Sequence, residues 1–312
     1  MTRYPLIELG LTSEGGWARA PAKVNLWLEV LGRRDDGFHE IETLMAPIDL
    51  CDRLELRQVG ETDQMIVAGL DIPGTDENIV LKALRQARQT RTIPPLQIHL
   101  TKGIPARAGL GGGSSDAAAM LVLLDALFPA PGNQLELHQQ AALLGSDVPF
   151  FLGQGAALAT GRGEILKPIS GPFLGGDGAF FNLIVPQMGL ETPAVYTALS
   201  ELLTYSDSHR NFPVGNFQES KVWLDSLYNR LLDGARRLDP RVNQIVAILE
   251  PLFAGRWTMT GSGSCFFVGA TDRTSSVKDA EILRCRFSEA TAGQPGPPPA
   301  EILTVPLLSP VG

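Results

Sequence analysis

The first clear periodicity in the chain is an alternation of apolar and polar side chains across residues 20–31. A period of two places successive side chains on opposite faces, so this segment predicts a β-strand. One face would hold Val24, Leu26 and Leu28, and the other would hold Lys23, Asn25, Trp27 and Glu29. Turn-forming residues at 32–40 predict a connection, after which 41–50 and 53–59 continue as short strand-like segments.

The spacing of apolar residues then changes from that of a strand to that of a helix. Asn78 precedes a segment, 79–90, with one apolar stripe and an opposite charged face, which predicts a helix capped by Asn78. A strand is predicted at 96–100, and the glycine-rich stretch 101–115 leads directly into an alanine- and leucine-rich helix from Asp116. The other predicted elements of this half are a helix at 135–144, a helix start at 146–149 and paired strands within 156–169.

The stretch 170–178 has the composition of a linker, so we place a domain boundary there, between residues 1–174 and 175–312. The elements predicted beyond it are a strand at 180–186, helices near 193–203, 220–237 and 240–254, a turn at 260–264 between two strands, a serine-capped helix near 276–290 and a last strand at 302–308. Strands and helices alternate without the regular rhythm of βαβ units. This arrangement favours a two-domain α+β fold over a doubly wound α/β fold.

Charge and composition narrow the range of partners. The 312 residues include 34 acidic and 26 basic side chains, which gives a formal net charge of −8. A surface with this balance repels a phosphate backbone or an anionic bilayer, so neither nucleic acid nor a membrane surface is expected as a partner. No apolar run approaches the roughly 18 residues that a membrane-spanning helix needs.

The first residues and the cysteines indicate where the protein works. The N-terminal segment has no cationic stretch followed by an apolar core of secretory length, so we expect a cytoplasmic protein. The three cysteines, Cys51, Cys265 and Cys285, are odd in number and widely spaced. This spacing suggests neither a disulfide framework nor a zinc site, and we expect them to be reduced and structural.

The glycine-rich segment 105–116, PARAGLGGGSSD, is the most informative stretch of the sequence. Glycines let a backbone approach a ligand closely and adopt positive φ, and a helix N-terminus offers unpaired N–H groups to an anion. Such a segment is suited to cradle phosphates, although a glycine-rich turn capped by Ser114 or Ser115 is an alternative. A Walker A loop is excluded because no lysine follows Gly113, and a dinucleotide fingerprint is excluded because the segment does not open a first βαβ unit.

The segment resembles the phosphate loop of the GHMP kinases, the small-molecule kinases named for galactose, homoserine, mevalonate and phosphomevalonate, in which P-x-x-x-G-L-G-S-S precedes a helix. The N-terminal motif PAKVNL at 21–26 and the C-terminal glycine loop TGSGSC at 260–265 resemble two further motifs of that superfamily, in the same order. The resemblance implies an N-terminal domain of the ribosomal protein S5 domain 2-like fold and a C-terminal ferredoxin-like α/β sandwich. It also implies ATP and Mg²⁺ as cofactors.

The continuation of the first motif to residue 45, together with GSDVPFF at 145–151, resembles the branch that phosphorylates a cytidine diphosphate-linked methylerythritol in the non-mevalonate route to isoprenoids. That small molecule is therefore the expected substrate, and the expected assembly is a monomer or weak homodimer. Two departures stand out: Phe38 replaces a usual tyrosine, and Asn229-Arg230 stands where an Asn-Asp pair is more common.

The resemblance implies that Lys23 and Asp147 form the catalytic pair. Transfer of a phosphoryl group to an alcohol needs a group that orients or deprotonates the hydroxyl and a positive charge near the transferring phosphoryl. From the residues alone, Asp147 before Val-Pro is most simply a helix N-cap, and Lys23 could be a solvated strand residue. The two interpretations of Asp147 are compatible only if its carboxylate points into the cleft.

The remaining site residues are also carried over from the resemblance. The ATP site comprises Asn78, Lys102, Pro105, Gly109, Leu110, Gly111, Gly112, Gly113, Ser114 and Ser115, with a serine hydroxyl near Mg²⁺ and its other ligands left open. The substrate site comprises Asn25, Phe38, His39, Thr192, Tyr196, Gly261, Ser262 and Gly263. Within it, Phe38 and Tyr196 would sandwich the cytosine while His39 reads its edge.

Several alternatives remain open from the sequence. Asn78 could serve only as a cap, Lys102 as a surface charge and His39 as a surface or core residue. The chain as a whole could be a non-catalytic metabolite sensor with this fold, or a kinase for a different alcohol. The presence of both Lys23 and Asp147 favours an enzyme, and the Phe38-His39 pair favours the cytidyl substrate.

Overall fold

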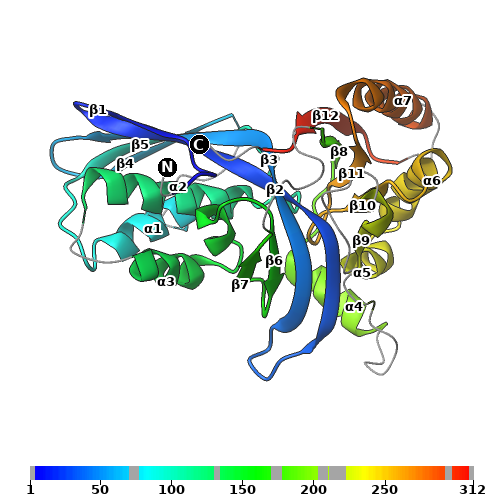
Figure 1. The fold of residues 1–312 in the computed structure, drawn as a ribbon, viewed down its shortest axis with the longest axis horizontal. Helices are drawn as coiled ribbons and strands as arrows, with labels where there is room; N and C mark the ends of the chain where they lie inside the picture. The colour runs from blue at the N-terminus through cyan, green and yellow to red at the C-terminus, as the bar shows by residue number, and fades with distance from the viewer. Residues whose placement is uncertain are drawn as a thin grey trace.

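The computed structural model describes residues 4–69, 77–129, 134–169, 178–202, 210, 223–291 and 297–308. These residues form two β-sheets, each covered by helices, and the longest strands run from one lobe of the molecule towards the other (Figure 1). The predicted α+β class is confirmed. No helix in the described parts of the chain is long and apolar enough to cross a membrane.

The first sheet is built on a long antiparallel hairpin. Its strands are β1 (Leu9–Thr12), β2 (Gly15–Arg33), β3 (His39–Gln58), β4 (Gln64–Ala68), β5 (Leu96–Thr101), β6 (Ala157–Thr160), β7 (Ile165–Pro168) and β9 (Tyr228–Asn229). The main path runs β1-β2-β3-β5-β4, with β6 on β3, β7 on β6 and β9 on β2. The far end of the β2–β3 hairpin projects away from the rest of this sheet (Figure 1).

Strand β2 confirms the predicted strand at 20–31 but not its two faces. A register shift between Asn25 and Trp27 places Leu26 as an extra residue opposite β3. An extra residue interrupts the period of two, so Trp27 lies in the same buried cluster as Val24 and Leu26 and not on the face of Lys23. Lys23 and Asn25 are themselves only 3% and 2% exposed, because both faces of this part of β2 are covered.

Strand β3 is one continuous element, and the prediction of separate short segments was wrong. The register between β2 and β3 shifts near Asp49, since Ala22 pairs with Ile48 whereas Pro21 pairs with Cys51. This irregularity in the middle of the strand accounts for the broken alternation in the sequence.

Three helices cover one face of the first sheet. They are α1 (Ile79–Ala87), α2 (Gly112–Leu127) and α3 (Gln134–Leu144), and Figure 1 shows all three on the same side of the sheet. Helix α2 begins four residues before the predicted start at Asp116, because the last glycines of the loop already adopt helical backbone geometry. Its residues from Ser115 to Leu124 are all buried, so this apolar helix forms the centre of the first core.

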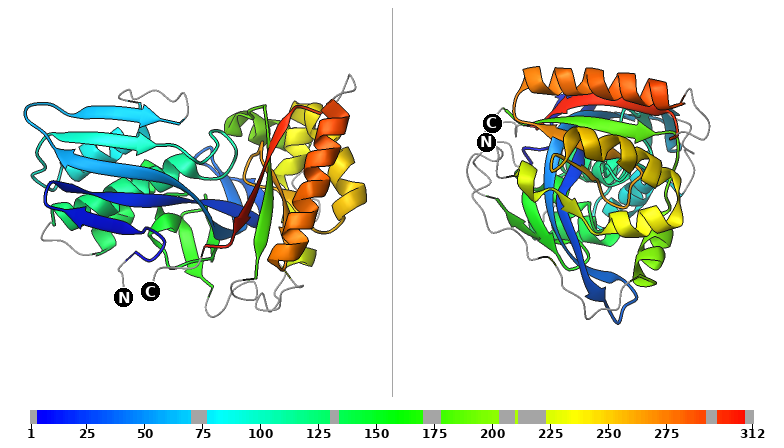
Figure 2. Two further views of the ribbon diagram at one scale, coloured as in Figure 1. Left: turned by 90° about the horizontal axis from the view of Figure 1, so that it is seen from above. Right: turned by 90° about the vertical axis from the view of Figure 1, so that its right-hand side faces the viewer.

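The second sheet has the strand order β10-β11-β8-β12, with β8 (Phe180–Pro186), β10 (Trp257–Met259), β11 (Phe266–Ala270) and β12 (Ala300–Pro306), all antiparallel. This order, with helices after β8 and after β11, is that of a ferredoxin-like βαββαβ unit. The helices are α4 (Thr192–Ser200), α5 (Leu231–Leu238), α6 (Arg241–Phe253) and α7 (Arg273–Thr291). Figure 2 shows α6 and α7 on the same face of this sheet.

The predicted helix at 220–237 was wrong over most of its first half. Where the structure describes this segment, a 3₁₀ turn at Leu224–Ser226 and strand β9 precede α5. Tyr228 and Asn229 pair in parallel with β2, so a long-range strand contact overrides the local helical preference. The predicted linker 170–178 lies outside the described residues except for Gly178, and the domain boundary within it stays a prediction.

A shared apolar cluster joins the two sheets. It combines Val24 and Leu26 of β2 with Phe181 of β8, Phe267 of β11 and Trp223. Because this cluster is continuous, the second sheet packs directly against the middle of β2, where Lys23 and Asn25 lie.

Candidate active site

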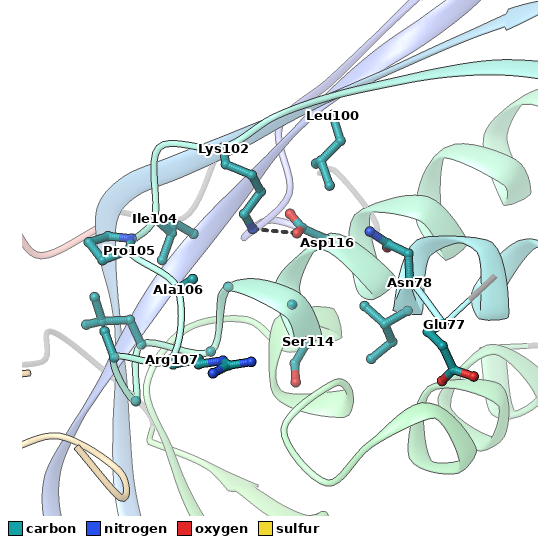
Figure 3. Close-up of a pocket in the computed structure, with 17 residues that line it drawn as sticks. Glu77, Asn78, Leu100, Lys102, Ile104, Pro105, Ala106, Arg107, Ser114 and Asp116 are labelled. Atoms are coloured by element: carbon teal, nitrogen blue, oxygen red, sulfur yellow. Dashed lines mark hydrogen bonds and ion pairs between the residues drawn. The ribbon is translucent and has the colours of Figure 1, made fainter. Parts of the chain in front are cut away.

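A cavity of about 490 Å³ lies along the glycine-rich loop, between α1 and the start of α2 (Figure 3). The described residues that line it fall within one stretch of chain: Glu77, Asn78, Ile79, Leu100, Lys102, Ile104, Pro105, Ala106, Arg107, Ala108, Gly109, Leu110, Gly111, Gly112, Gly113, Ser114 and Asp116. Every residue predicted for the ATP site is among them except Ser115. We call this space the nucleotide cavity.

The loop has left-handed backbone at two of its glycines. Gly109 has φ +73° and Gly111, which stands at the N-cap of α2, has φ +74°. A Cβ atom at Gly109 would lie 2.2 Å from the carbonyl oxygen of Thr260, and one at Gly111 would lie 3.0 Å from Lys23 Cγ. Both positions therefore need glycine, because the backbone is left-handed and there is no room for a Cβ atom. Without side chains, these residues leave the N-terminus of α2 open to an anion.

The two serines of the loop point in different directions. Ser114 lines the nucleotide cavity, and its hydroxyl is visible at the near end of α2 in Figure 3. Ser115 is fully buried, does not line either cavity, and its Oγ has no hydrogen-bond partner among the described residues. Of the two hydroxyls, only that of Ser114 is placed to meet a ligand.

Asn78 caps α1, as its sequence context predicts. Its side-chain oxygen accepts a hydrogen bond from the backbone N–H of Val80 at 3.0 Å, and the residue also lines the cavity. The cap and a contact with a nucleotide are therefore compatible.

Lys102 lies in a buried cluster of charges that borders the nucleotide cavity, and Figure 3 shows its contact with Asp116. Its ammonium group donates to Asp52 and, at 2.6 Å, to Asp116, and its side chain is only 4% exposed. Burial lowers the pKa of Lys102, but the charges of Asp116 and Asp52 outweigh this effect and raise it. Burial raises the pKa of Asp116 to about 8, against the opposing effect of Lys102. Lys102 is thus no surface charge.

Asp52 connects this cluster to the phosphate loop. One of its oxygens accepts backbone N–H groups from Gly103 at 2.7 Å and Ile104 at 2.8 Å, directly before the loop. Asp52 could not be predicted from the sequence, because nothing local distinguishes it from the other acidic residues of β3. The pairing of β3 with β5 is what brings it beside Lys102.

A second cavity, of about 700 Å³, lies on the other side of the loop and shares Gly109 and Gly111 with the first. We call it the substrate cavity. Its other lining residues come from widely separated parts of the chain: Lys23, Asn25, Leu28, Arg33, Gly37, Phe38, His39, Ile41, Thr43, Ser146, Asp147, Arg162, Thr192, Pro193, Tyr196, Thr197, Ser200, Leu231, Gly261 and Ser262. All residues predicted for the substrate site line it except Gly263.

Lys23 and Asp147 meet in the substrate cavity. Lys23 Nζ lies 3.4 Å from Asp147 Oδ2 and donates to Asn25 Oδ1 at 2.6 Å. The Asn25 amide in turn donates to Thr43 Oγ1 at 2.9 Å, which fixes its orientation. The Lys23 side chain is 4% exposed and that of Asp147 is 34% exposed, so a rigid, buried cation supports a carboxylate that solvent or a ligand can reach.

The alternatives considered for these two residues are not observed. Lys23 is not solvated. The 3₁₀ turn at Pro149–Leu152 has Val148 at its N-cap and no side-chain capping bond, so Asp147 does not act as the cap. Its carboxylate is directed into the cavity.

The hairpin end and α4 bring aromatic side chains together. The rings of His39 and Tyr196 stack with centroids 4.7 Å apart, and His39 Nε2 lies 3.1 Å from Ser200 Oγ. Phe38 is 52% exposed, with the Arg162 guanidinium 4.8 Å above its ring. Burial, together with the charge of Arg33, lowers the pKa of His39. Tyr196 therefore stacks on His39 in this structure, and Phe38 lines the same cavity.

The C-terminal glycine loop contributes two of its three predicted residues. Gly261 and Ser262 line the substrate cavity, and Ser262 Oγ lies 2.7 Å from Thr192 Oγ1. Gly263 lines neither cavity; a Cβ atom there would lie 2.8 Å from Met259 Sδ, so its constraint is internal packing. Gly263 thus allows the loop to pack closely against Met259 and does not face a ligand cavity.

Two residues that were not predicted as part of the site hold this loop in place. Asn229 donates to the carbonyls of Met259 at 2.7 Å and Gly261 at 2.8 Å. Thr260 donates to the carbonyl of Gly109 at 3.2 Å and thereby joins the C-terminal loop to the phosphate loop. Both stood within motifs quoted from the sequence, but their roles depend on contacts across the two lobes.

The comparison with protein families agrees with the motifs. The profile of the family described as "GHMP kinases N terminal domain" matches residues 78–155, which include the phosphate loop and Asp147. The 4-diphosphocytidyl-2-C-methyl-D-erythritol kinase of Porphyromonas gingivalis is 36% identical over 269 residues, covering 85% of this chain and 95% of that protein. The enzyme of the same name from Thermus thermophilus is 38% identical over 282 residues, covering 89% of this chain and 95% of that protein.

Solved structures agree with the fold. A crystal structure of 4-(cytidine 5'-diphospho)-2C-methyl-D-erythritol kinase superposes with a TM-score of 0.71 at 34% identity, covering 93% of this chain and 99% of that chain. Methanococcus jannaschii mevalonate kinase shares the fold alone, with a TM-score of 0.62 at 15% identity over 95% of this chain and 99% of its own. With about a third of positions identical across most of both chains, this chain belongs to the 4-diphosphocytidyl-2-C-methyl-D-erythritol kinase family of the GHMP kinases.

Proposed function

We propose that this protein transfers the γ-phosphoryl group of ATP to the 2-hydroxyl of 4-diphosphocytidyl-2-C-methyl-D-erythritol, giving the 2-phosphate and ADP in the non-mevalonate route to isoprenoid precursors. The observation that carries the proposal is the contact of Lys23 and Asp147 beside a loop that lines both cavities. A phosphate held on Gly109 and Gly111 from one side faces the acceptor alcohol on the other. Family membership supports the substrate.

Asp147 is the proposed acceptor of the hydroxyl proton. Its carboxylate is the more exposed member of the pair and can approach a substrate hydroxyl to hydrogen-bond distance. Lys23 orients the carboxylate through their 3.4 Å contact, and its charge lies where negative charge develops on the transferring phosphoryl group. Asn25 holds the Lys23 ammonium at 2.6 Å, so little reorganisation is needed when the substrate binds.

Mg²⁺ is proposed to bind with the nucleotide. The described residues contain no cluster of three or more acidic, histidine or cysteine side chains that could hold a metal by themselves. Mg²⁺ needs no such cluster when phosphates supply most of its ligands, and the Ser114 hydroxyl in the nucleotide cavity provides a suitable oxygen. When bound, the ion neutralises charge on the β- and γ-phosphates.

His39 is proposed to read the cytosine edge. The Ser200 hydroxyl donates to the Tyr196 carbonyl at 2.9 Å, so the imidazole Nε2 is left to donate to Ser200. In the neutral ring, Nδ1 is then an acceptor, which suits the 4-amino group of cytosine and not the 4-carbonyl of uracil. The lowered pKa of His39 supports the neutral form. Phe38 and Tyr196 both line the substrate cavity and can offer aromatic faces to the base.

A coupled ADP-release assay tests this function directly. Purified protein with ATP and Mg²⁺ should release ADP with the cytidyl substrate and much more slowly with mevalonate or homoserine. Turnover of mevalonate or homoserine at a comparable kcat/KM would identify a kinase for another alcohol. Tight binding of ATP and the cytidyl compound without ADP release would identify a sensor.

A further inference from the structure

Arg107 has an unusual backbone conformation within the phosphate loop. Its φ is +53°, and among the described residues it is the only non-glycine with positive φ. A left-handed conformation is unfavourable for a side chain with a Cβ, and such residues are concentrated at functional sites. A long cationic side chain has thus been placed where glycine would be less strained.

The Arg107 side chain lies over the nucleotide cavity. It is one of the residues that line this space, and Figure 3 shows its guanidinium extending across the cavity in the direction of Ser114. Its Nη1 forms an ion pair of 3.2 Å with Glu191 Oε1, and the two side chains are 76% and 70% exposed. Glu191 directly precedes Thr192, the first residue of α4.

The other cations near the phosphate loop are already engaged. Lys102, the only other cationic residue lining the nucleotide cavity in the described chain, is buried between Asp52 and Asp116. Lys23 contacts Asn25 and Asp147 on the substrate side. Among the described residues, the one ion-pair partner of Arg107 is the exposed carboxylate of Glu191, and exposed pairs of this kind contribute little to stability. A polyphosphate can therefore displace Glu191 readily.

We propose that Arg107 binds the β- or γ-phosphate of the nucleotide and that Glu191 is a counter-ion which the phosphate displaces. The planar guanidinium matches two phosphate oxygens, so the exchange replaces one exposed pair by a bidentate contact next to the N-terminus of α2. The inference rests on the proposed function, because it assigns the polyphosphate of ATP to this cavity.

Calorimetric titration with AMP, ADP and a non-hydrolysable ATP analogue, all with Mg²⁺, tests the proposal. Arg107→Ala and Arg107→Gly should each weaken the ATP analogue roughly ten-fold while leaving AMP unchanged, the loss expected for one charge-assisted contact. Arg107→Lys should lose less than either. Glu191→Gln should tighten the ATP analogue several-fold, and this gain should vanish in the Arg107→Ala background.

The two small substitutions separate charge from strain. Arg107→Gly removes the unfavourable φ, so it should unfold at a higher temperature than Arg107→Ala, yet both should lose the same affinity for polyphosphate. Arg53→Ala, which removes an exposed arginine paired with Glu55 on β3, is the matched control for general charge. Its nucleotide affinities should equal those of the wild type.

Three results would overturn the inference: unchanged affinity of both Arg107 variants for the ATP analogue, an equal loss for AMP, or a Glu191→Gln effect that persists without Arg107. If the wild-type protein itself fails to bind the ATP analogue, the proposed function fails instead. The affinity that the Arg107 variants lose for ADP identifies the phosphate. A loss equal to that for the ATP analogue assigns the contact to the β-phosphate, and a loss seen only with the ATP analogue assigns it to the γ-phosphate.

Discussion

The two cavities that meet at the phosphate loop are built in different ways. Among the described residues, those that line the nucleotide cavity all fall within 77–116, and four of the 17 are glycines of the phosphate loop. The substrate cavity draws side chains from β2, β3, the Asp147 turn, α4 and the C-terminal glycine loop, over residues 23–262. One cavity is a local feature of the chain, and the other is assembled by the tertiary fold.

This difference teaches where each cavity is vulnerable. The nucleotide cavity depends on φ at a few glycines and on the residues, such as Asp52, that hold the phosphate loop in place. The substrate cavity depends on each contributing side chain and on the packing of β2 against the second sheet. Gly109 and Gly111 belong to both cavities, so they are the positions where the two kinds of constraint coincide.

The largest effect is expected in the substrate cavity, from Asp147→Asn. An amide can still hydrogen-bond a substrate hydroxyl but cannot take its proton, so kcat should fall about 10²- to 10⁴-fold. The Kd for the cytidyl substrate should stay within a few-fold of the wild type. Steady-state kinetics and calorimetry measure the two quantities. Near wild-type turnover would remove Asp147 from the chemistry.

The anchor of the nucleotide cavity is tested by Asp52→Asn. The amide oxygen can still accept the Gly103 and Ile104 N–H groups, but the amide NH2 group then faces the buried Lys102 ammonium and cannot accept its hydrogen bond. Breaking a buried ion pair should lower the free energy of unfolding by about 3 kcal/mol, as measured by urea denaturation. Asp49→Asn, which removes one member of an exposed pair with Arg19, is the control and should cost less than about 1 kcal/mol. Equal losses for the two variants would contradict the anchoring role.

Gly111→Ala tests the boundary between the cavities. The added Cβ would meet Lys23 Cγ and Phe151 Cζ at 3.0 Å in a left-handed conformation, so the loop or Lys23 must move. ATP affinity and kcat should each fall roughly ten-fold or more, with a smaller loss for the cytidyl substrate. Gly113→Ala, where the nearest atom is 3.8 Å away, should not destabilise folding. A loss confined to the cytidyl substrate would show that the loop serves only that cavity.

Base selectivity is the next smaller effect. If His39 accepts from the cytosine amino group, the uridyl analogue should be disfavoured about ten- to a hundred-fold in kcat/KM, because a mismatched buried polar group costs about 1–3 kcal/mol. His39→Ala should narrow this ratio, whereas Tyr196→Ala should weaken both compounds alike. An unchanged ratio in His39→Ala would make the histidine an ordinary loop residue.

The smallest expected effect is a pH dependence of the same contact. The pKa of His39 lies below its usual 6.5, so the neutral ring predominates at pH 6.5 and above. Protonation removes the Nδ1 acceptor, so KM for the cytidyl substrate should rise as the pH falls through this lowered pKa and level off at higher pH. In His39→Ala, the rise of KM at low pH should disappear. A rise that persists in this variant would belong to another group.

The sequence by itself determined the parts of the protein that depend on neighbouring residues. The Asn78 cap, the stripe of α1 and the strand β5 follow from local spacing, and the structure confirms them. The described lining of the nucleotide cavity lies within 40 consecutive positions, counted from residue 77 to residue 116, so motif and site nearly coincide.

The tertiary structure alone decided the rest. The bulge at Leu26, the burial of Lys23 and strand β9 in place of a predicted helix all require contacts between residues far apart in the sequence. The ion pair of Arg107 with Glu191 likewise joins residues 84 positions apart, as their numbers show. Local spacing reports which face a side chain occupies along one element, whereas burial and pairing depend on which other element covers that face.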